Sequence, residues 1–231
     1  INTETPDASA ALDITSTTGG FLIPRMTETQ RDAISQAATG LMIYQTDGTV
    51  GFYYYNGSNW SEVGTTSPTY SIGNVVNDGV VFWLDSTGQH GLVCAFSDYA
   101  TSLEWGCDGT DLPTVPNVPY NGGVPAGLGA EIGDGVTNTN DILADCSTAP
   151  AALAARSLGP DWFLPSAKEL NQMFINKTTL EAVSGFSAFS IYYWSSTEYD
   201  SNFAWSQYLD DGFQIYSDKY FTVNVRAVRA F

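Results

Sequence analysis

The sequence predicts an α+β protein with two domains, residues 1–66 and 67–231. Short runs of β-branched and aromatic residues, bounded by Gly, Asn and Asp, indicate strands along much of the chain. Capping patterns in the second half indicate helices between those strands. A small, polar, proline-containing stretch at residues 64–69 is typical of a linker, and 231 residues suffice for two hydrophobic cores.

The first domain is predicted to be rich in strands. The expected elements are a strand at 11–14, an extended segment at 19–26, a short helix near 31–34, and strands at 41–44, 50–55 and 60–63. Thr27 and Gln30 form a capping-box pattern ahead of the helix, and Asp47 with Gly48 predicts a hairpin turn. Because the domain has few core residues, we expect oligomerisation to bury its apolar faces.

The second domain is predicted to mix strands and helices. The expected elements are a hairpin at 78–85 and 90–95, a loop at 106–145, helices at 150–156 and 167–174, and short strands from 186 to 228. Gly, Pro, Asn, Asp and Thr dominate the loop region. Thr148 can cap the first helix, and Ser166 with Glu169 forms a capping box for the second.

The charge balance excludes several classes of partner. The net charge is −17 with only 8 basic residues, which argues against binding nucleic acid or anionic lipid. No apolar run approaches the roughly 18 residues that a membrane span needs, so we expect no membrane insertion. The composition is typical of β-rich extracellular or virion proteins. Because the chain begins with Ile1 and lacks a signal-peptide pattern, we expect it to be a piece of a longer protein.

Three cysteines allow one disulfide and one free thiol. We expect the pair Cys107 and Cys146, since both lie in Gly- and Asp-rich loop sequence that a crosslink would restrain. Cys94 lies in an apolar strand pattern, where a buried thiol is inert. The spacing contains no zinc signature, and His90 is the one histidine of the sequence.

One segment carries oxygen ligands of the kind that calcium prefers. These residues are Asp134, Asn138, Asn140 and Asp141. The alternative is a network of Asx turns, because Asn and Asp are ordinary turn residues and the EF-hand spacing is absent. The sequence therefore allows calcium and requires no cofactor.

The last forty residues, 192–231, hold 12 of the 31 aromatic side chains, set among Ser, Asn, Gln and Asp. Rigid aromatic rings beside short polar residues are typical of protein contact surfaces. The expected ligand-contact face comprises Tyr199, Asp200, Asn202, Phe203, Trp205, Gln207, Tyr208, Asp210, Asp211, Phe213, Gln214, Tyr216 and Asp218. The alternative is that strand alternation turns half of these rings into the core. Trp162 and Trp194 are expected in the core, and Arg226 and Arg229 in structural hydrogen bonds.

The first domain resembles a module found in trimeric phage tail fibres and bacterial surface fibres. The segments that carry this resemblance are 11–14, 20–27, 30–34, 40–44 and 52–57. The resemblance implies a homotrimeric base that joins an upstream fibre shaft to a distal head.

The order of elements in the second domain, with its two ends together, fits the C-type-lectin architecture. Its sequence resembles the C-terminal domain of the collagen-like bacterial adhesin at 79–93, 105–107, 138–142, 161–166, 169–171, 193–198 and 225–229. The resemblance implies a trimeric adhesin head on a lectin-like fold that also carries retroelement-diversified tips. That adhesin binds sulfated polysaccharide, whereas here Lys219 is the one cation expected in the contact strip, so a sulfated glycan fits poorly. The sugar-binding tripeptides of true C-type lectins are also absent.

These observations predict the receptor-binding tip, an adhesin, of a homotrimeric fibre that serves host attachment. It would be extracellular, on a phage virion tail fibre or a bacterial surface fibre, and recognise a cell-surface protein or a neutral glycan. One alternative is a purely structural fibre or appendage subunit, in which the aromatic strip packs subunits together. The other is an enzyme on the sulfatase-activating-oxidase-like fold, which the lack of reactive cysteines and of a Ser-His-Asp group argues against.

Overall fold

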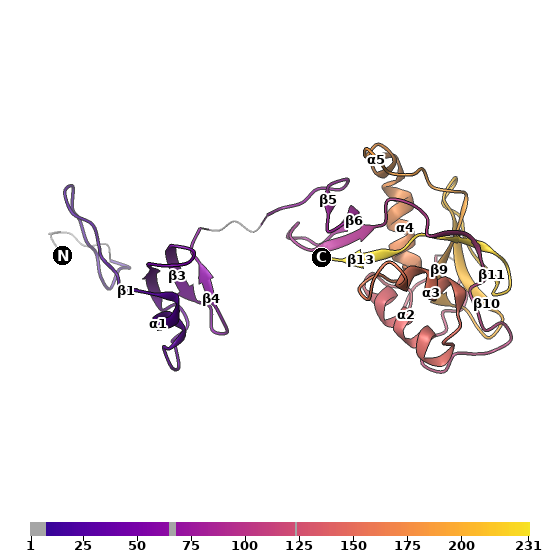
Figure 1. Ribbon diagram of the computed structural model, residues 1–231, viewed down its shortest axis with the longest axis horizontal. Coiled ribbons are helices and arrows are strands. Elements are labelled where there is room, and N and C mark those ends of the chain that lie inside the picture. The colour runs from indigo at the N-terminus through magenta and orange to yellow at the C-terminus, as the bar shows by residue number, and fades with distance from the viewer. Residues whose placement is uncertain (1–7, 65–67, 123) are drawn as a thin grey trace. The chain divides into compact units, whose positions relative to one another are not determined.

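A computed structural model describes residues 8–64, 68–122 and 124–231. The chain forms two compact units, Ile1–Ser67 and Pro68–Phe231 (Figure 1). Each unit has its own sheets, and the expected division of the chain lay within the same linker.

In the described residues of the first unit there is one four-stranded sheet and one short helix. Its elements are β1 (Arg25–Met26), α1 (Glu28–Asp32), β2 (Met42–Gln45), β3 (Gly51–Tyr55) and β4 (Trp60–Glu62). The strands follow the order β1-β2-β3-β4, with β1 parallel to β2 and the other pairs antiparallel. The capping box of Thr27 and Gln30 is present at the start of α1, as predicted.

The strand predicted at residues 11–14 is wrong. This segment pairs with no strand of the described chain, and it leaves Leu12 58% and Ile14 39% exposed. A strand needs a neighbouring strand to pair its backbone groups, and none of the described strands lies beside this segment.

The described residues of the second unit form two sheets and four helices. Its elements are β5 (Val75–Val76), β6 (Gly79–Leu84), β7 (Gly91–Cys94), β8 (Ala100–Leu103), α2 (Asp134–Asp145), α3 (Pro150–Arg156), α4 (Ala167–Ile175), α5 (Lys177–Glu181), β9 (Tyr192–Glu198), β10 (Phe203–Tyr208), β11 (Gln214–Asp218), β12 (Val223–Val225) and β13 (Val228–Ala230). The sheets follow the orders β11-β10-β9-β12-β8 and β13-β7-β6-β5. Helix α4 packs against β6, β9 and β10 and so contacts both sheets.

The two ends of the second unit lie together. β13 pairs with β7, and β5 pairs with β6 in the same sheet. Near these strands the rings of Tyr70 and Phe231 pack edge to face with centroids 5.0 Å apart. Trp162 and Trp194 are both buried, as expected.

The helices differ from the prediction in three places. Helix α2 occupies the end of the stretch predicted as loop. The Asn138 amide donates to the carbonyl of Gly129, and the Thr139 hydroxyl bonds to Gly135 within the helix and to the distant Leu164. Helix α3 has Pro150 at its first turn and Ala149 at the N-cap, so the predicted cap at Thr148 is wrong. Helix α5 was not predicted. The capping box of Ser166 at α4 is present, as predicted.

Candidate functional site

Strand alternation divides the predicted contact face between two sides of one sheet. Trp205 pairs with Tyr216 across β10 and β11, so both side chains lie on the same side. Phe203 lies on that side too, two residues before Trp205. Tyr208 lies on the opposite side, three residues after Trp205. Figure 1 shows β9, β10 and β11 next to one another.

Trp205 and Gln207 are buried, which removes them from the exposed contact face. The Trp205 indole N–H donates to the carbonyl of Val118 at 2.7 Å, and the ring is 1% exposed. The Gln207 side-chain amide donates to Asn171 Oδ1 at 2.8 Å. Both polar groups have hydrogen-bond partners within the fold, so these two residues form part of the core beneath the exposed rings.

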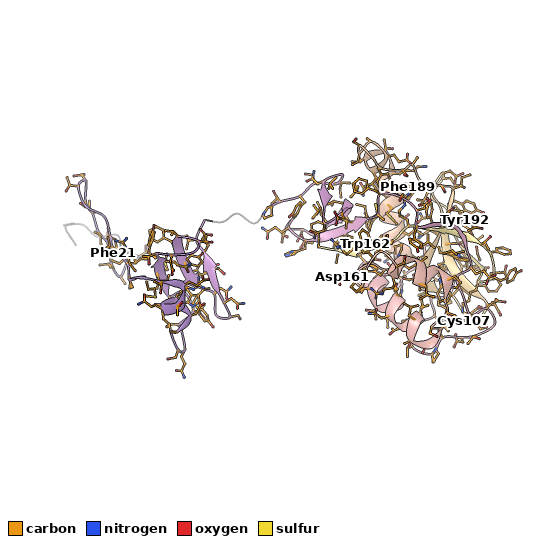
Figure 2. The ribbon with its side chains drawn as sticks, viewed as in Figure 1. Phe21, Cys107, Asp161, Trp162, Phe189 and Tyr192 are labelled. Atoms are coloured by element: carbon orange, nitrogen blue, oxygen red, sulfur yellow. A yellow bond between two sulfur atoms is a disulfide. The ribbon has the colours of Figure 1, made fainter. Side chains whose placement is uncertain are left out.

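Tyr208 packs away from the other aromatic residues of the strip. Its ring stacks on Tyr192, labelled in Figure 2, with centroids 4.2 Å apart. The Tyr192 hydroxyl lies in hydrogen-bond contact with Ser206 and Ser217, and burial raises the pKa of that hydroxyl. Tyr208 therefore belongs to a structural pair on the other side of the sheet.

Five rings gather on the first side of the sheet, and they are Tyr120, Tyr199, Phe203, Trp205 and Tyr216. Tyr199 and Tyr216 stack with centroids 4.3 Å apart, and Phe203 meets Tyr216 edge to face at 5.6 Å. Tyr120 lies 6.4 Å from both Trp205 and Tyr216. Neighbouring rings fix one another, so the surface they form is rigid.

A groove of about 520 Å³ opens beside these rings. We call it the aromatic groove, and it is lined by Tyr120, Val124, Trp205, Gly212, Phe213, Gln214, Ile215 and Tyr216. Tyr120, Phe213 and Tyr216 are 56%, 57% and 38% exposed. Large rings exposed together are uncommon on a protein surface without a binding role.

Tyr120, Val124 and Ile215 line the groove but were not among the predicted contact residues. Tyr120 and Val124 come from the Gly- and Pro-rich stretch that precedes α2. An exposed aromatic residue within such a loop is a weak signal in a sequence, because nothing local shows what it will meet. Trp205 draws this stretch in through its bond to Val118.

The acidic residues of the strip shape its turns. Asp200 Oδ1 accepts the backbone N–H groups of Asn202 and Phe203 at 2.8 and 3.0 Å. Asp211 Oδ1 accepts the N–H of Phe213 at 2.9 Å. Asn202, Asp210 and Asp211 are exposed, and Asp218 and Gln214 are half-buried. None of these carboxylates lines the groove, but Asp211 lies two residues before Phe213, which does, and accepts its backbone N–H.

Lys219 is buried and cannot serve as a surface cation. Its ammonium contacts Glu198 Oε1, lies 4.8 Å from the Trp105 ring centroid and donates to the carbonyl of Thr110 at 2.9 Å. Burial raises the pKa of Glu198 to about 7, although Lys219 acts in the opposite direction. The contact strip, 199–218, therefore contributes no basic side chain to its surface.

Arg226 and Arg229 make structural contacts, as expected. Arg226 is buried, and its Nε donates to Asp98 Oδ1 at 2.6 Å. Arg229 donates to the carbonyl of Asn77 at 2.5 Å and lies over the Trp162 ring.

The structure contains the expected disulfide between Cys107 and Cys146, with Cα atoms 6.3 Å apart (Figure 2). It ties the start of the stretch that carries Tyr120 to the end of helix α2. Cys94 is a buried free thiol, and burial raises its pKa to about 12. Such a thiol is a poor nucleophile.

The four expected calcium ligands do not form a loop. They lie along helix α2, where the Asn138 amide donates to Gly129 and Ser196, and Arg156 binds Asn140. Asp134 accepts two backbone N–H groups, at 2.7 and 2.9 Å. Within 8–64, 68–122 and 124–231, no group of three or more His, Cys, Asp or Glu could hold a metal ion.

A second exposed surface of the protein lies in the first unit, on the side of its sheet opposite α1. Cross-strand pairing places Met42 beside Tyr54 and Tyr44 beside Phe52 on this side. Gln45 on the other side receives a hydrogen bond from Arg31 of α1. We call the first side the apolar sheet face.

The apolar sheet face extends into the segment before β1. Phe21 (Figure 2), Leu22 and Ile23 line a second groove together with Arg25, Tyr44 and Phe52. Phe21 and Leu22 are 66% and 78% exposed, and Phe52 is 47% exposed. A small unit with this much apolar surface in water lacks the burial that stabilises a fold.

One comparison matches the first unit and the start of the second, and another extends over most of the chain. Residues 1–78 match the family model described as a phage tail like trimerisation region. Among solved structures, the chain is similar to a fimbrial protein from Bacteroides ovatus ATCC 8483, with 18% identity and a TM-score of 0.44 over 82% of this chain. The chain spans 50% of that protein's length. No curated protein matches the chain significantly.

The helices of the described chain are short or polar. None of them has the length and apolar character needed to cross a bilayer.

Proposed function

We propose that the chain is the receptor-binding tip of a homotrimeric fibre, with the aromatic groove as its binding site. The observation that carries the proposal is the exposure of Tyr120, Phe213 and Tyr216 around one groove. The volume lies within the range of ligand pockets, roughly 300–1,000 Å³. Exposed rings on a rigid support are typical of residues that dominate binding energy.

The support for a trimeric state comes from the first unit. Its match to a trimerisation region and its apolar sheet face both support association of three copies. Burial of Phe52 and its neighbours between copies would supply the core that a single copy lacks. Three linked sites also raise the apparent affinity for a surface with many receptors.

The proposal also includes the fold of the second unit and the location of the protein outside the cell. Two sheets with packed helices, and with the ends of the unit together, are consistent with a C-type-lectin-like frame. The disulfide suits an oxidising environment outside the cytoplasm. We therefore place the protein on a phage virion or a bacterial surface, in a fibre or appendage.

Cell binding of the labelled full chain tests this function. Phe213→Ser and Tyr120→Ser should abolish binding to a panel of bacterial strains, because each removes an exposed ring of the groove. Tyr220→Ser is the matched control, since Tyr220 is 51% exposed and does not line the groove. Unchanged binding by both groove variants would contradict the proposal. A structural subunit would instead form open polymers that the groove variants dissolve.

A further inference from the structure

We propose that the aromatic groove binds a positively charged side chain, an arginine or a lysine, presented by a receptor protein. This inference rests on the tip function proposed above and names the chemistry of its partner.

The groove offers ring surfaces that attract cations. Tyr120, Phe213 and Tyr216 expose a third or more of their surface there, and Trp205 lies beneath them. The face of an aromatic ring carries negative charge, so a cation within about 6 Å of its centre is attracted. The long aliphatic stem of Arg or Lys can pack against the same rings.

Carboxylates lie near both ends of the strand that borders the groove. Asp218 follows Tyr216 by two residues on β11, so the two side chains share one side of the sheet. Asp211 precedes Phe213 by two residues and accepts its backbone N–H. β11 is the edge strand of its sheet, which leaves this border open to a partner.

Two of the three nearby lysines are already paired with carboxylates outside the groove lining. The lining of the groove in the described chain includes no Lys or Arg. Lys168 pairs with Glu131 at 2.5 Å, and Lys219 is buried against Glu198. Lys177 donates to the carbonyl of Leu209 at 2.8 Å. The net charge of −17 adds a long-range attraction for a cationic partner.

The fold already holds cations by this combination of rings and a carboxylate. The Arg226 guanidinium lies 4.8 and 4.6 Å from the ring centroids of Phe186 and Phe189. Its Nε donates to Asp98 at 2.6 Å. The described lining of the aromatic groove presents rings without a basic residue, and the carboxylates of Asp211 and Asp218 flank the strand that borders it.

The lining favours a protein side chain over a sugar. A sugar ring needs several hydrogen-bond partners, but Gln214 is the one polar side chain of the lining besides the tyrosine hydroxyls and the Trp205 indole. The Gln214 amide already donates to the carbonyl of Ala167 at 2.8 Å, and the Trp205 N–H to Val118. An anion would meet Asp211 and Asp218.

Three small probes applied to the full chain test the charge preference. They are benzamidine, whose amidinium is planar and cationic like a guanidinium, benzoate, and methyl α-D-glucopyranoside. Saturation-transfer NMR should give a millimolar dissociation constant for benzamidine and at least about tenfold weaker binding for benzoate. Benzamidine binding should weaken as salt rises from about 20 to about 500 mM.

Matched variants locate the binding. Phe213→Ser, or Asp211→Asn with Asp218→Asn, should weaken benzamidine binding by about fivefold or more. Tyr220→Ser, and Asp108→Asn with Asp161→Asn, remove a ring or the same charge at exposed positions outside the groove lining. These controls should bind benzamidine like the unchanged chain.

The inference is overturned if benzoate or the glucoside binds as tightly as benzamidine, or if the control pairs have the same effect as the groove variants. Its failure is distinguishable from failure of the tip function. If Phe213→Ser abolishes cell binding but benzamidine binds no more tightly than benzoate or the glucoside, the tip function is supported and the cationic partner is contradicted. If both Phe213→Ser and Tyr120→Ser leave cell binding intact, the tip function is contradicted.

Discussion

Tyr199 and Tyr216 stack with ring centroids 4.3 Å apart and planes inclined by 24°, one ring following β9 and the other on the edge strand β11. This pair fixes the inner wall of the ring cluster, while Phe213 extends from the same edge with most of its surface in water. The site thus combines rings that hold the fold with rings that are free to meet a partner.

The first prediction separates these two kinds of ring. Tyr216→Ala should lower the free energy of unfolding by about 2–3 kcal/mol, because it removes contacts with Tyr199, Phe203 and Trp205. Phe213→Ser should change it by less than about 0.5 kcal/mol, since the ring is exposed. Urea unfolding measures both. Equal destabilisation would show that Phe213 is a packing residue.

The second prediction concerns the pH dependence of stability. Burial raises the pKa of Glu169 to about 7, although backbone N–H groups of Ser166 and Gly133 bind the carboxylate at 2.8 Å. A raised pKa stabilises the fold fully below the unfolded value of about 4.5, and this stability is lost as pH rises through about 7.

The loss should reach about 2–3 kcal/mol between pH 4 and pH 8, relative to a chain without this group. Glu169→Gln cannot titrate, so its stability should fall less over this range than that of the unchanged chain. Thermal melting of both proteins at matched ionic strength gives the difference. Parallel curves would mean that folding does not raise the pKa of Glu169.

The third prediction links the disulfide to the groove. Cys107→Ser with Cys146→Ser opens a crosslink across 39 residues and should cost about 2–4 kcal/mol of stability. The stretch that carries Tyr120 should then become more sensitive to proteolysis, and cell binding should fall even at temperatures where the chain remains folded. Cleavage sites mapped by mass spectrometry check this. Protection equal to that of the oxidised chain would contradict it.

The fourth prediction tests the apolar sheet face. Phe52→Ser should shift the chain from trimer toward monomer, measured by light scattering after size exclusion. Each copy would lose about 1.5–3 kcal/mol of the stabilisation that comes from burying this ring. Phe221→Ser is the control, since Phe221 is 46% exposed in the second unit and lies outside the matched residues 1–78. A Phe52→Ser chain that remains as trimeric as the control at low micromolar concentration would place the interface elsewhere.

Local signals in the sequence predicted much of the fold. The hairpins and the capping boxes of Thr27 and Ser166 depend on residues a few positions apart, and the structure contains them. Helix α2 was missed because Asn138 and Thr139 resemble turn residues until their partners, Ser196 and Leu164, are known. Such partners lie far away in the sequence and cannot be inferred from composition.

The candidate site was predictable only in part. The strip contains Phe213 and Tyr216, and the alternative that strand alternation hides some of its rings applies to Trp205, which is buried on the side opposite Tyr208. That signal was present in the sequence. The position of Tyr120 and Val124 in the lining could not be predicted, because it depends on how a loop with few regular contacts packs against β10.

Photocrosslinking on intact target cells tests the central claim most directly. A benzoylphenylalanine placed at Phe213 should capture a cell-surface protein, whereas the same group at Tyr220 should capture none. Capture of equal amounts from both positions, or capture at Phe213 of nothing but other copies of this chain, would contradict a receptor-binding groove.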